Sequence, residues 1–192
     1  MPDTEVPNRR RALLLIDFQR DFLADDGRMP VARNQVIPVL AATRAAIDRA
    51  RCEGKLIVKI GNEFRRGDII GNLARHHAAV ACGPGTRWDP RADIDGAVYL
   101  AKWKADAFCN PELHRLLAGH RIEQVLLAGL YAKACVTATG KGALARGLRV
   151  TVLADAVACR SDATREAALS GLGRLGAELL YTGSAGLLPA RD

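Results

Sequence analysis

The sequence predicts a three-layer α/β/α domain built on a mostly parallel sheet of six strands. Short apolar runs, typical of strands buried on both faces, alternate along the chain with segments of helical periodicity. Strands that alternate with helices pair in parallel through right-handed crossovers, so helices cover both faces of the sheet. Because 49% of the residues are hydrophobic and 5% are aromatic, we expect a mainly aliphatic core.

Six apolar runs are predicted as strands, at residues 12–16, 56–60, 97–103, 125–130, 150–155 and 177–181. Helices are predicted at residues 35–52, 110–119 and 134–146, and from Ser161 or Asp162 to about Leu175. The clearest helix start is Asn110-Pro111-Glu112, with a capping side chain, a proline at the first position and an acid in the first turn.

Two segments depart from this alternation. Residues 1–10 are polar, contain two prolines and predict a flexible tail, so a single domain is expected over residues 11–192. Residues 61–96 are rich in glycine and predict a long irregular excursion, with a short helix near residues 69–80. Long loops inside compact domains are often functional.

The charge and cysteine content limit the partners and the compartment. The net charge of +7 comes mostly from scattered arginines without interleaved aromatic residues, so we expect no nucleic-acid partner. A solvated basic surface explains it best, with steering of small anionic substrates as the alternative. Five cysteines without a CxxC pair favour the reducing cytoplasm. The apolar run that ends at Asp17 is too short for a signal sequence or a membrane span.

Three reactive side chains are expected at the carboxyl edge of the sheet, where ligands gather in such folds. Asp17 ends the first strand, Lys102 lies near the end of the third, and Cys135 follows the fourth and opens a helix. An ammonium group and a helix N-terminus both favour a thiolate, and a carboxylate can carry the proton. Taken singly, each has a simpler explanation as a turn acid, a surface lysine or a core cysteine.

Three segments resemble the isochorismatase-like cysteine hydrolases. They are RALLLIDFQRDF at residues 11–22, KWKADAF at 102–108 and VLLAGLYAKACV at 125–136, within a resemblance that spans about residues 11–182. The resemblance implies a Rossmann-like fold, a homo-oligomer (dimer or tetramer), and a catalytic triad of Asp17, Lys102 and Cys135. It also chooses Lys102 over Lys104, which shares its face of the strand.

The resemblance implies further features around the nucleophile. It implies a cis peptide bond between Leu130 and Tyr131 and an oxyanion hole made of the Tyr131 and Cys135 backbone amides. The other four cysteines fall outside the matched segments and are expected to be structural; they are Cys52, Cys82, Cys109 and Cys159.

The segment after the second strand argues against a metal. Zinc-using nicotinamidases of this superfamily carry an Asp-x-His type ligand set there, whereas this chain has Gly61-Asn62-Glu63-Phe64. The adjacent pair His76-His77 comes later and is poorly arranged to share one ion. We therefore expect neither a metal nor another cofactor.

The predicted function is cysteine-dependent hydrolysis of a C–N bond in a small linear amide, ureide or carbamoyl compound, through a thioester. One alternative is an isochorismatase-type vinyl-ether hydrolase, because Leu130-Tyr131-Ala132 and Lys102-Trp103 resemble segments of true isochorismatases, which lack the cysteine. A second is a non-catalytic binding member of the family. Five residues are candidates for substrate contact, although Glu63 could equally be a solvated loop acid; they are Phe22, Asn62, Glu63, Trp103 and Tyr131.

Overall fold

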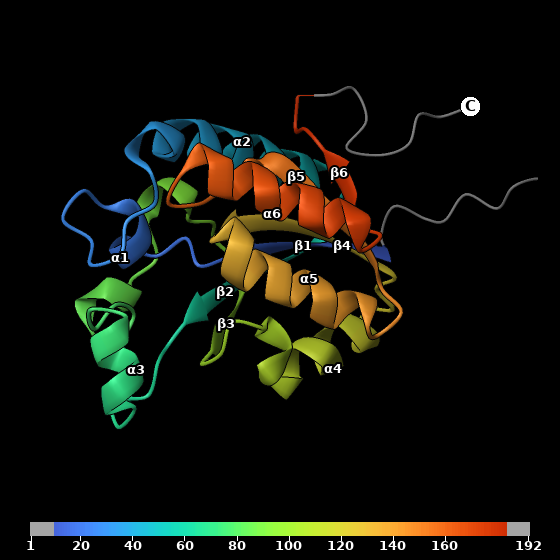
Figure 1. Cartoon of the computed structure of the whole chain (residues 1–192). Helices are drawn as coiled ribbons and strands as arrows, with labels where there is room; N and C mark the ends of the chain where they lie inside the picture. Colours follow the sequence, from blue (N-terminus) through green and yellow to red (C-terminus); the bar gives the residue numbers. More distant parts are fainter. Residues whose placement is uncertain (1–9, 184–192) are drawn as a thin grey trace, which may run out of the picture.

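The computed structural model describes residues 10–183 and has one six-stranded sheet in the order β3-β2-β1-β4-β5-β6, with every pair parallel (Figure 1). The strands are β1 Arg11–Ile16, β2 Leu56–Asn62, β3 Val98–Lys102, β4 Gln124–Leu130, β5 Arg149–Ala158 and β6 Glu178–Leu180. The predicted α/β fold with six strands is confirmed. The predicted tail, residues 1–10, lies outside the described residues except for Arg10.

Helices pack on both faces of this sheet. They are α1 Arg20–Leu23, α2 Arg33–Cys52, α3 Ile69–Ala74, α4 Pro111–Gly119, α5 Thr137–Leu144 and α6 Asp162–Arg174. Leu13 and Leu126 lie against α2, whereas Leu127 and Val150 lie beside Gly140 of α5 on the other face. Every residue of β1 and β4 is buried, as expected for central strands covered on both sides. Within the described residues no helix is long and apolar enough to cross a membrane.

The strand order creates a switch point between β1 and β4. From β1 the chain moves outward through β2 to β3, and it then returns to place β4 on the other side of β1. Crossovers that leave in opposite directions open a crevice at the carboxyl ends of the two central strands, where ligands bind in such sheets. Asp17 directly follows β1, and the segment that holds Cys135 directly follows β4.

Two regions differ in detail from the sequence prediction. The helix expected over residues 134–146 begins instead as a π-helical turn, Ala132–Val136, and continues as α5 to Leu144. The excursion contains α3 and two 3-10 turns, Pro84–Thr86 and Pro90–Ala92, and it is anchored to the core through the buried carboxylate of Asp21. This carboxylate accepts the Ala79 amide at 2.8 Å, so the excursion is held against α1.

Gly129 permits the close packing of the two central strands at the edge where Asp17 emerges. Its φ of 147° is rare for residues with a side chain, and a Cβ there would lie 2.2 Å from the Ile16 carbonyl oxygen. The register of β4 against β5 also shifts between Leu127 and Gly129. A side chain at this position would therefore push away the end of β1 that carries Asp17.

We expect Gly129→Ala to destabilise the protein by about 3 kcal/mol, because it combines backbone strain with a main-chain clash. Urea unfolding measures the change. Gly171→Ala is the matched control, since Gly171 lies inside α6, where the nearest neighbour of an added methyl group would be Arg174 Nη2 at 3.9 Å. The control should gain up to about 1 kcal/mol of helix propensity. Equal stability of the two variants would contradict this account of Gly129.

Candidate active site

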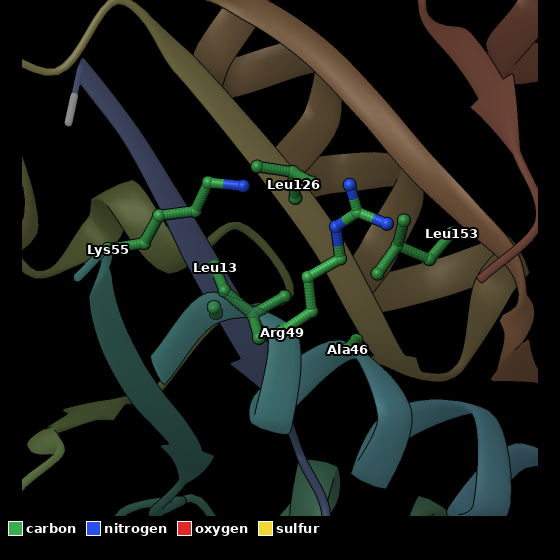
Figure 2. Close-up of a pocket in the computed structure, with 7 residues that line it drawn as sticks. Leu13, Ala46, Arg49, Lys55, Leu126 and Leu153 are labelled. Carbon is green, nitrogen blue, oxygen red and sulfur yellow. The ribbon is translucent and has the colours of Figure 1, made fainter. Parts of the chain in front are cut away.

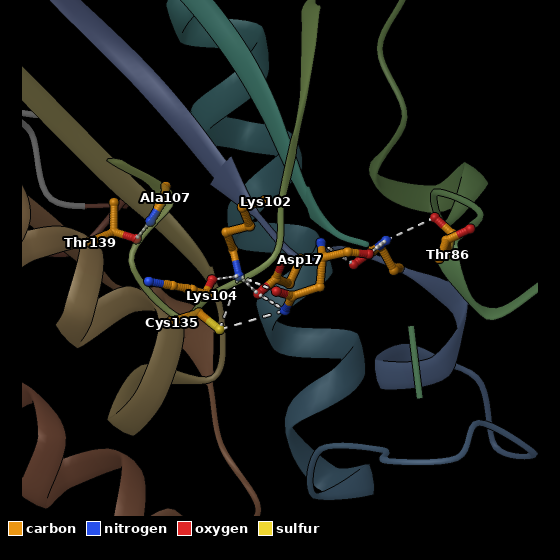
Figure 3. A network of polar contacts seen from close by, with 9 residues as sticks. Asp17, Thr86, Lys102, Lys104, Ala107, Cys135 and Thr139 are labelled. Carbon is orange, nitrogen blue, oxygen red and sulfur yellow. Dashed lines mark hydrogen bonds and ion pairs between the residues drawn. The ribbon is translucent and has the colours of Figure 1, made fainter. Parts of the chain in front are cut away.

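The structure brings Asp17, Lys102 and Cys135 into contact at the carboxyl edge of the sheet (Figure 3). The Lys102 ammonium lies 3.0 Å from Asp17 Oδ2 and 3.2 Å from Cys135 Sγ. It also donates to the Lys104 main-chain carbonyl at 3.4 Å. The ammonium of Lys102 thus sits between a carboxylate and a thiol, each delivered by a different strand.

Asn62, the last residue of β2, links the acid to the lysine. Its Nδ2 donates to Asp17 Oδ2 at 2.9 Å, and its Oδ1 accepts from Lys102 Nζ at 2.6 Å. The same Nδ2 lies 3.7 Å from Cys135 Sγ. Because both ends of the amide are engaged, its orientation is fixed and it holds the carboxylate beside the ammonium.

Gln19 is a site residue that the sequence analysis missed. Its side-chain carbonyl accepts the Asn62 main-chain amide at 2.8 Å, and its Nε2 donates to the Asn62 and Thr86 carbonyls at 2.9 Å each. Gln19 is fully buried, so it locks the end of β2 to the excursion. The sequence feature that could have identified Gln19 is its place two positions after Asp17, between Phe18 and Phe22. Both phenylalanines are buried in the structure.

The Tyr131–Cys135 segment aims the thiol at this cluster. The Leu130–Tyr131 peptide bond is cis, which confirms that prediction. The Tyr131 carbonyl accepts the amides of Ala134 and Val136, the two neighbours of Cys135, at 3.0 and 3.2 Å. This wide turn is the π-helical start of α5, a local geometry that is frequent at functional sites.

The cluster is almost completely removed from water, with Asp17, Lys102 and Cys135 exposed by 1%, 0% and 7%. Burial raises the pKa of the Asp17 carboxyl, although Lys102 opposes the change. Burial opposes the charge of Lys102, but Asp17 and Cys135 outweigh it and raise the pKa of the lysine. The ion pair is therefore maintained by mutual attraction inside an environment that disfavours isolated charges.

The resting thiol differs from the sequence expectation. Burial first, and then the negative charge of Asp17, raise the pKa of the Cys135 thiol to about 12, against the opposing effect of Lys102. Cys135 is therefore a neutral thiol at neutral pH, not the thiolate that a lysine and a helix N-terminus alone would favour. If this sulfur acts as a nucleophile, its proton has to leave as it reacts, and a base has to accept that proton.

Asp17 has the geometry of such a base. Its backbone adopts φ 60°, an uncommon conformation for a residue with a side chain, directly after the buried strand β1. Its Oδ2 is occupied by Asn62 and Lys102, while no donor among residues 10–183 bonds to its buried Oδ1. One carboxylate oxygen is thus fixed and the other is available to accept a proton.

A cavity of about 440 Å³ opens over Cys135 and Asn62. Most of its walls are apolar or aromatic; its lining residues are Phe22, Met29, Asn62, Phe64, Arg75, Trp103, Lys104, Ala105, Tyr131, Ala134 and Cys135. Four of the five residues expected to contact substrate therefore line it. Glu63 does not, because its carboxylate accepts the Tyr99 hydroxyl at 2.8 Å outside the cavity.

A second cavity lies among Leu13, Arg49, Lys55 and Leu126 (Figure 2). Lys55 and Leu13 lie at the opposite edge of the sheet from Cys135, near the starts of β2 and β1. This cavity has a volume of about 10 Å³, which is room for a single water molecule. It is too small for an organic substrate.

The residues after β2 do not suit a metal. Both side-chain atoms of Asn62 are engaged by the ion pair, and Glu63 is directed to Tyr99. Over residues 10–183, no three His, Cys, Asp or Glu side chains are grouped to hold an ion. That the reaction needs no metal stays a prediction.

A family model for the isochorismatase domain matches residues 11–183. The chain belongs to the isochorismatase family. Among curated proteins, a streptothricin hydrolase of Streptomyces noursei is 30% identical over 152 residues, which cover 76% of this chain. The match covers 53% of that relative, so the chain spans about half of its length.

Solved structures share the fold of this isochorismatase-family protein. An isochorismatase-like hydrolase from Alkaliphilus metalliredigens superposes with a TM-score of 0.82 at 21% identity, covering 90% of this chain and 94% of the other. N-carbamoylsarcosine amidase from Thermoplasma acidophilum gives a TM-score of 0.78 at 23% identity, covering 92% and 99%. At these identities the likeness shows the fold.

The raised pKa of Cys135 predicts a characteristic pH profile of alkylation. Iodoacetamide modifies thiolates, so the rate at Cys135 in the folded protein should still be rising at pH 10. The urea-unfolded chain is the control, because there the thiol regains its ordinary pKa of about 8.5 and the rate levels off above it. Peptide mass spectrometry resolves the five cysteines. A rate at folded Cys135 that is already flat from pH 7 upward would mean a resting thiolate.

Proposed function

We propose that this protein hydrolyses a C–N bond in a small linear amide, ureide or carbamoyl compound, with Cys135 as nucleophile. The observation that carries the proposal is the buried Lys102 ammonium, which lies 3.2 Å from Cys135 Sγ and 3.0 Å from Asp17 Oδ2 beside a 440 Å³ cavity. Together these groups supply a thiol nucleophile, a carboxylate that can carry its proton and a cation that stabilises developing negative charge, which suits amide cleavage through a thioester.

In the first half of the reaction, Cys135 Sγ attacks the carbonyl carbon while its proton passes to Asp17 Oδ1. Lys102 stabilises the negative charge that develops on sulfur, and its contact with Asp17 Oδ2 keeps the carboxylate in place. Because the resting thiol is a weak acid, proton transfer and C–S bond formation proceed together. Asp17 then gives the proton to the departing nitrogen, and the C–N bond breaks to leave a thioester.

In the second half, water attacks the thioester carbon and Asp17 takes one of its protons. The C–S bond breaks, the acid product leaves, and the thiol regains its proton. Asp17 thus serves first as base and then as acid in each half. The overall change consumes one water and releases a carboxylic acid or carbamic acid and an amine or ammonia.

We also propose that the Tyr131 and Cys135 backbone amides form the oxyanion hole. The first amides of a helix lack intrahelical partners and point toward its N-terminal end, where they stabilise negative charge. Cys135 lies in the first turn of the continuous π-helical and α-helical segment that begins at Ala132. A carbonyl carbon in contact with its sulfur would have its oxygen near these amides.

The family supports hydrolysis, and one fold neighbour is an amidase of a carbamoyl compound. The proposal includes a small-molecule substrate, a cytoplasmic location and a dimer or tetramer. All five cysteines are unpaired, which agrees with a reducing compartment. Light scattering after size exclusion measures the oligomeric state.

We expect Cys135→Ala to lose at least a thousandfold of kcat in an ammonia-release assay over a panel of linear amides and ureides, because no covalent intermediate can form. Rapid acid quenching of the wild type should reveal the acyl group on Cys135 by mass spectrometry. Cys52→Ala is the control, since Cys52 is exposed at the end of α2. Efficient cleavage of isochorismate by Cys135→Ala would instead support the vinyl-ether reaction, in which Asp17 alone acts as the acid.

Lys102→Ala and Lys104→Ala separate two lysines that lie two positions apart. Only the Lys102 side chain contacts Asp17 and Cys135, whereas Lys104 contributes its main-chain carbonyl to the network. We expect Lys102→Ala to reduce kcat by at least a hundredfold and Lys104→Ala to keep most of it. Circular dichroism checks the folding of both variants. The opposite ranking of the two kcat values would remove Lys102 from the mechanism.

A further inference from the structure

The cavity over Cys135 carries a positive charge that the proposed reaction does not use. Asp17 and Lys102 neutralise each other beneath it. Its lining contains two further ionisable side chains apart from the thiol and Tyr131, and both are cations, Arg75 and Lys104; no acid is part of the lining. Around them stand apolar and aromatic walls. The acid that pairs with Arg75 is Asp68, which is half exposed and is not part of the lining.

Arg75 is held in place before any ligand arrives. Its guanidinium carbon lies 3.9 Å from the centre of the Phe64 ring, within range of a cation–π contact. Its Nη2 donates to Asp68 at 2.6 Å and to Asn72 at 3.1 Å. Three contacts therefore orient the planar group, and the entropy cost of ordering a long side chain is already met within the protein.

The rest of the guanidinium is not used by the protein. In the described part of the chain, its hydrogen bonds all come from Nη2, and the buried Nε has no acceptor. A simple surface arginine would point its donors to water, but this one is only 26% exposed and lines the cavity. Nη1 therefore keeps two N–H groups that none of the described residues accepts, and an oriented guanidinium with free N–H groups is suited to a carboxylate.

The excursion, residues 61–96, places Arg75 at the cavity. Phe64 and Arg75 both belong to residues 61–96, and one bond within this segment and one to α1 fix the part that carries them. The Phe64 amide donates to the Ala79 carbonyl at 2.9 Å, and the Ala79 amide donates to the buried Asp21 carboxylate at 2.8 Å. These bonds hold the guanidinium at a fixed position relative to Cys135.

We propose that Arg75 determines specificity by binding a carboxylate of the substrate, so that the substrate is a linear amide or carbamoyl compound with a carboxylate at its far end. This inference rests on the proposed amide hydrolysis and narrows it. The single free terminal nitrogen, Nη1, and the apolar walls favour a carboxylate of one charge over a phosphate, whose larger charge costs more to remove from water. Lys104 adds to the positive potential at the cavity.

The test compares charged and neutral versions of one amide. The probes are ω-amido carboxylates with two, three and four methylene groups between the two carbonyl carbons, and the methyl ester of each. For at least one chain length, wild-type kcat/KM should favour the acid over its ester by tenfold or more. Arg75→Gln should abolish this preference by raising KM for the acid while kcat changes less than threefold. Arg75→Lys should keep part of it.

Arg66→Gln is the matched control, because Arg66 lies in the same segment, bonds to the Ala81 carbonyl and is not part of the cavity lining. It removes the same charge and should leave the preference intact. Equal kcat/KM for acid and ester in the wild type, or a preference that survives Arg75→Gln, would overturn the role of Arg75 while amide hydrolysis stands.

A binding measurement separates this inference from the proposed function. If no amide is hydrolysed, the proposed reaction fails, and the site is then probed by calorimetry with the dicarboxylates succinate, glutarate and adipate. Binding of at least one by the wild type and by Arg66→Gln, weakened tenfold or more in Arg75→Gln, supports the carboxylate site. Absence of binding to the wild type, or equal binding to Arg75→Gln, would refute it.

Discussion

The contact between the Lys102 ammonium and the Asp17 carboxylate is the constraint on which the site depends. Both groups are removed from water, and each alone would cost several kcal/mol to bury. Because a pair of apolar residues would fill the same space at lower cost, stability gives no reason to keep the charges there. The two buried charges need polar partners, which Asn62 provides directly and Gln19 supports by binding the Asn62 main chain. Together these contacts hold the carboxyl ends of β1, β2 and β3 in one arrangement.

The convergence of Asp17, Lys102 and Cys135 could be predicted from the sequence because it follows from topology. Asp17 and Lys102 stand at the ends of apolar runs and Cys135 follows one by a short turn, and parallel pairing brings such ends to one edge. The state of the thiol could not be predicted in the same way. A neighbouring lysine and a helix N-terminus are visible in the sequence, whereas the burial that outweighs them is a property of the assembled structure.

The sequence also could not predict which side chains of the excursion face the cavity. Residues 61–96 have no periodicity that would indicate which side chains face inward, so Glu63 was a candidate for substrate contact and Arg75 was not. In the structure Glu63 is bound by Tyr99, and Arg75 reaches the cavity by lying across Phe64. Their positions depend on Asp21 and on turns in which His76, His77, Ala79 and Cys82 take positive φ values. Such turns at residues other than glycine or asparagine have no reliable sequence signature.

The protonated thiol of Cys135 also has a consequence for durability. Peroxides and disulfides attack thiolates, and their reaction with a neutral thiol is slow. In the proposed reaction, Cys135 loses its proton only when a carbonyl carbon is in place, so it presents little of the reactive form to oxidants between turnovers. Burial that makes Cys135 a weak acid therefore also protects it from irreversible oxidation to sulfinic and sulfonic acids, which would end the proposed reaction.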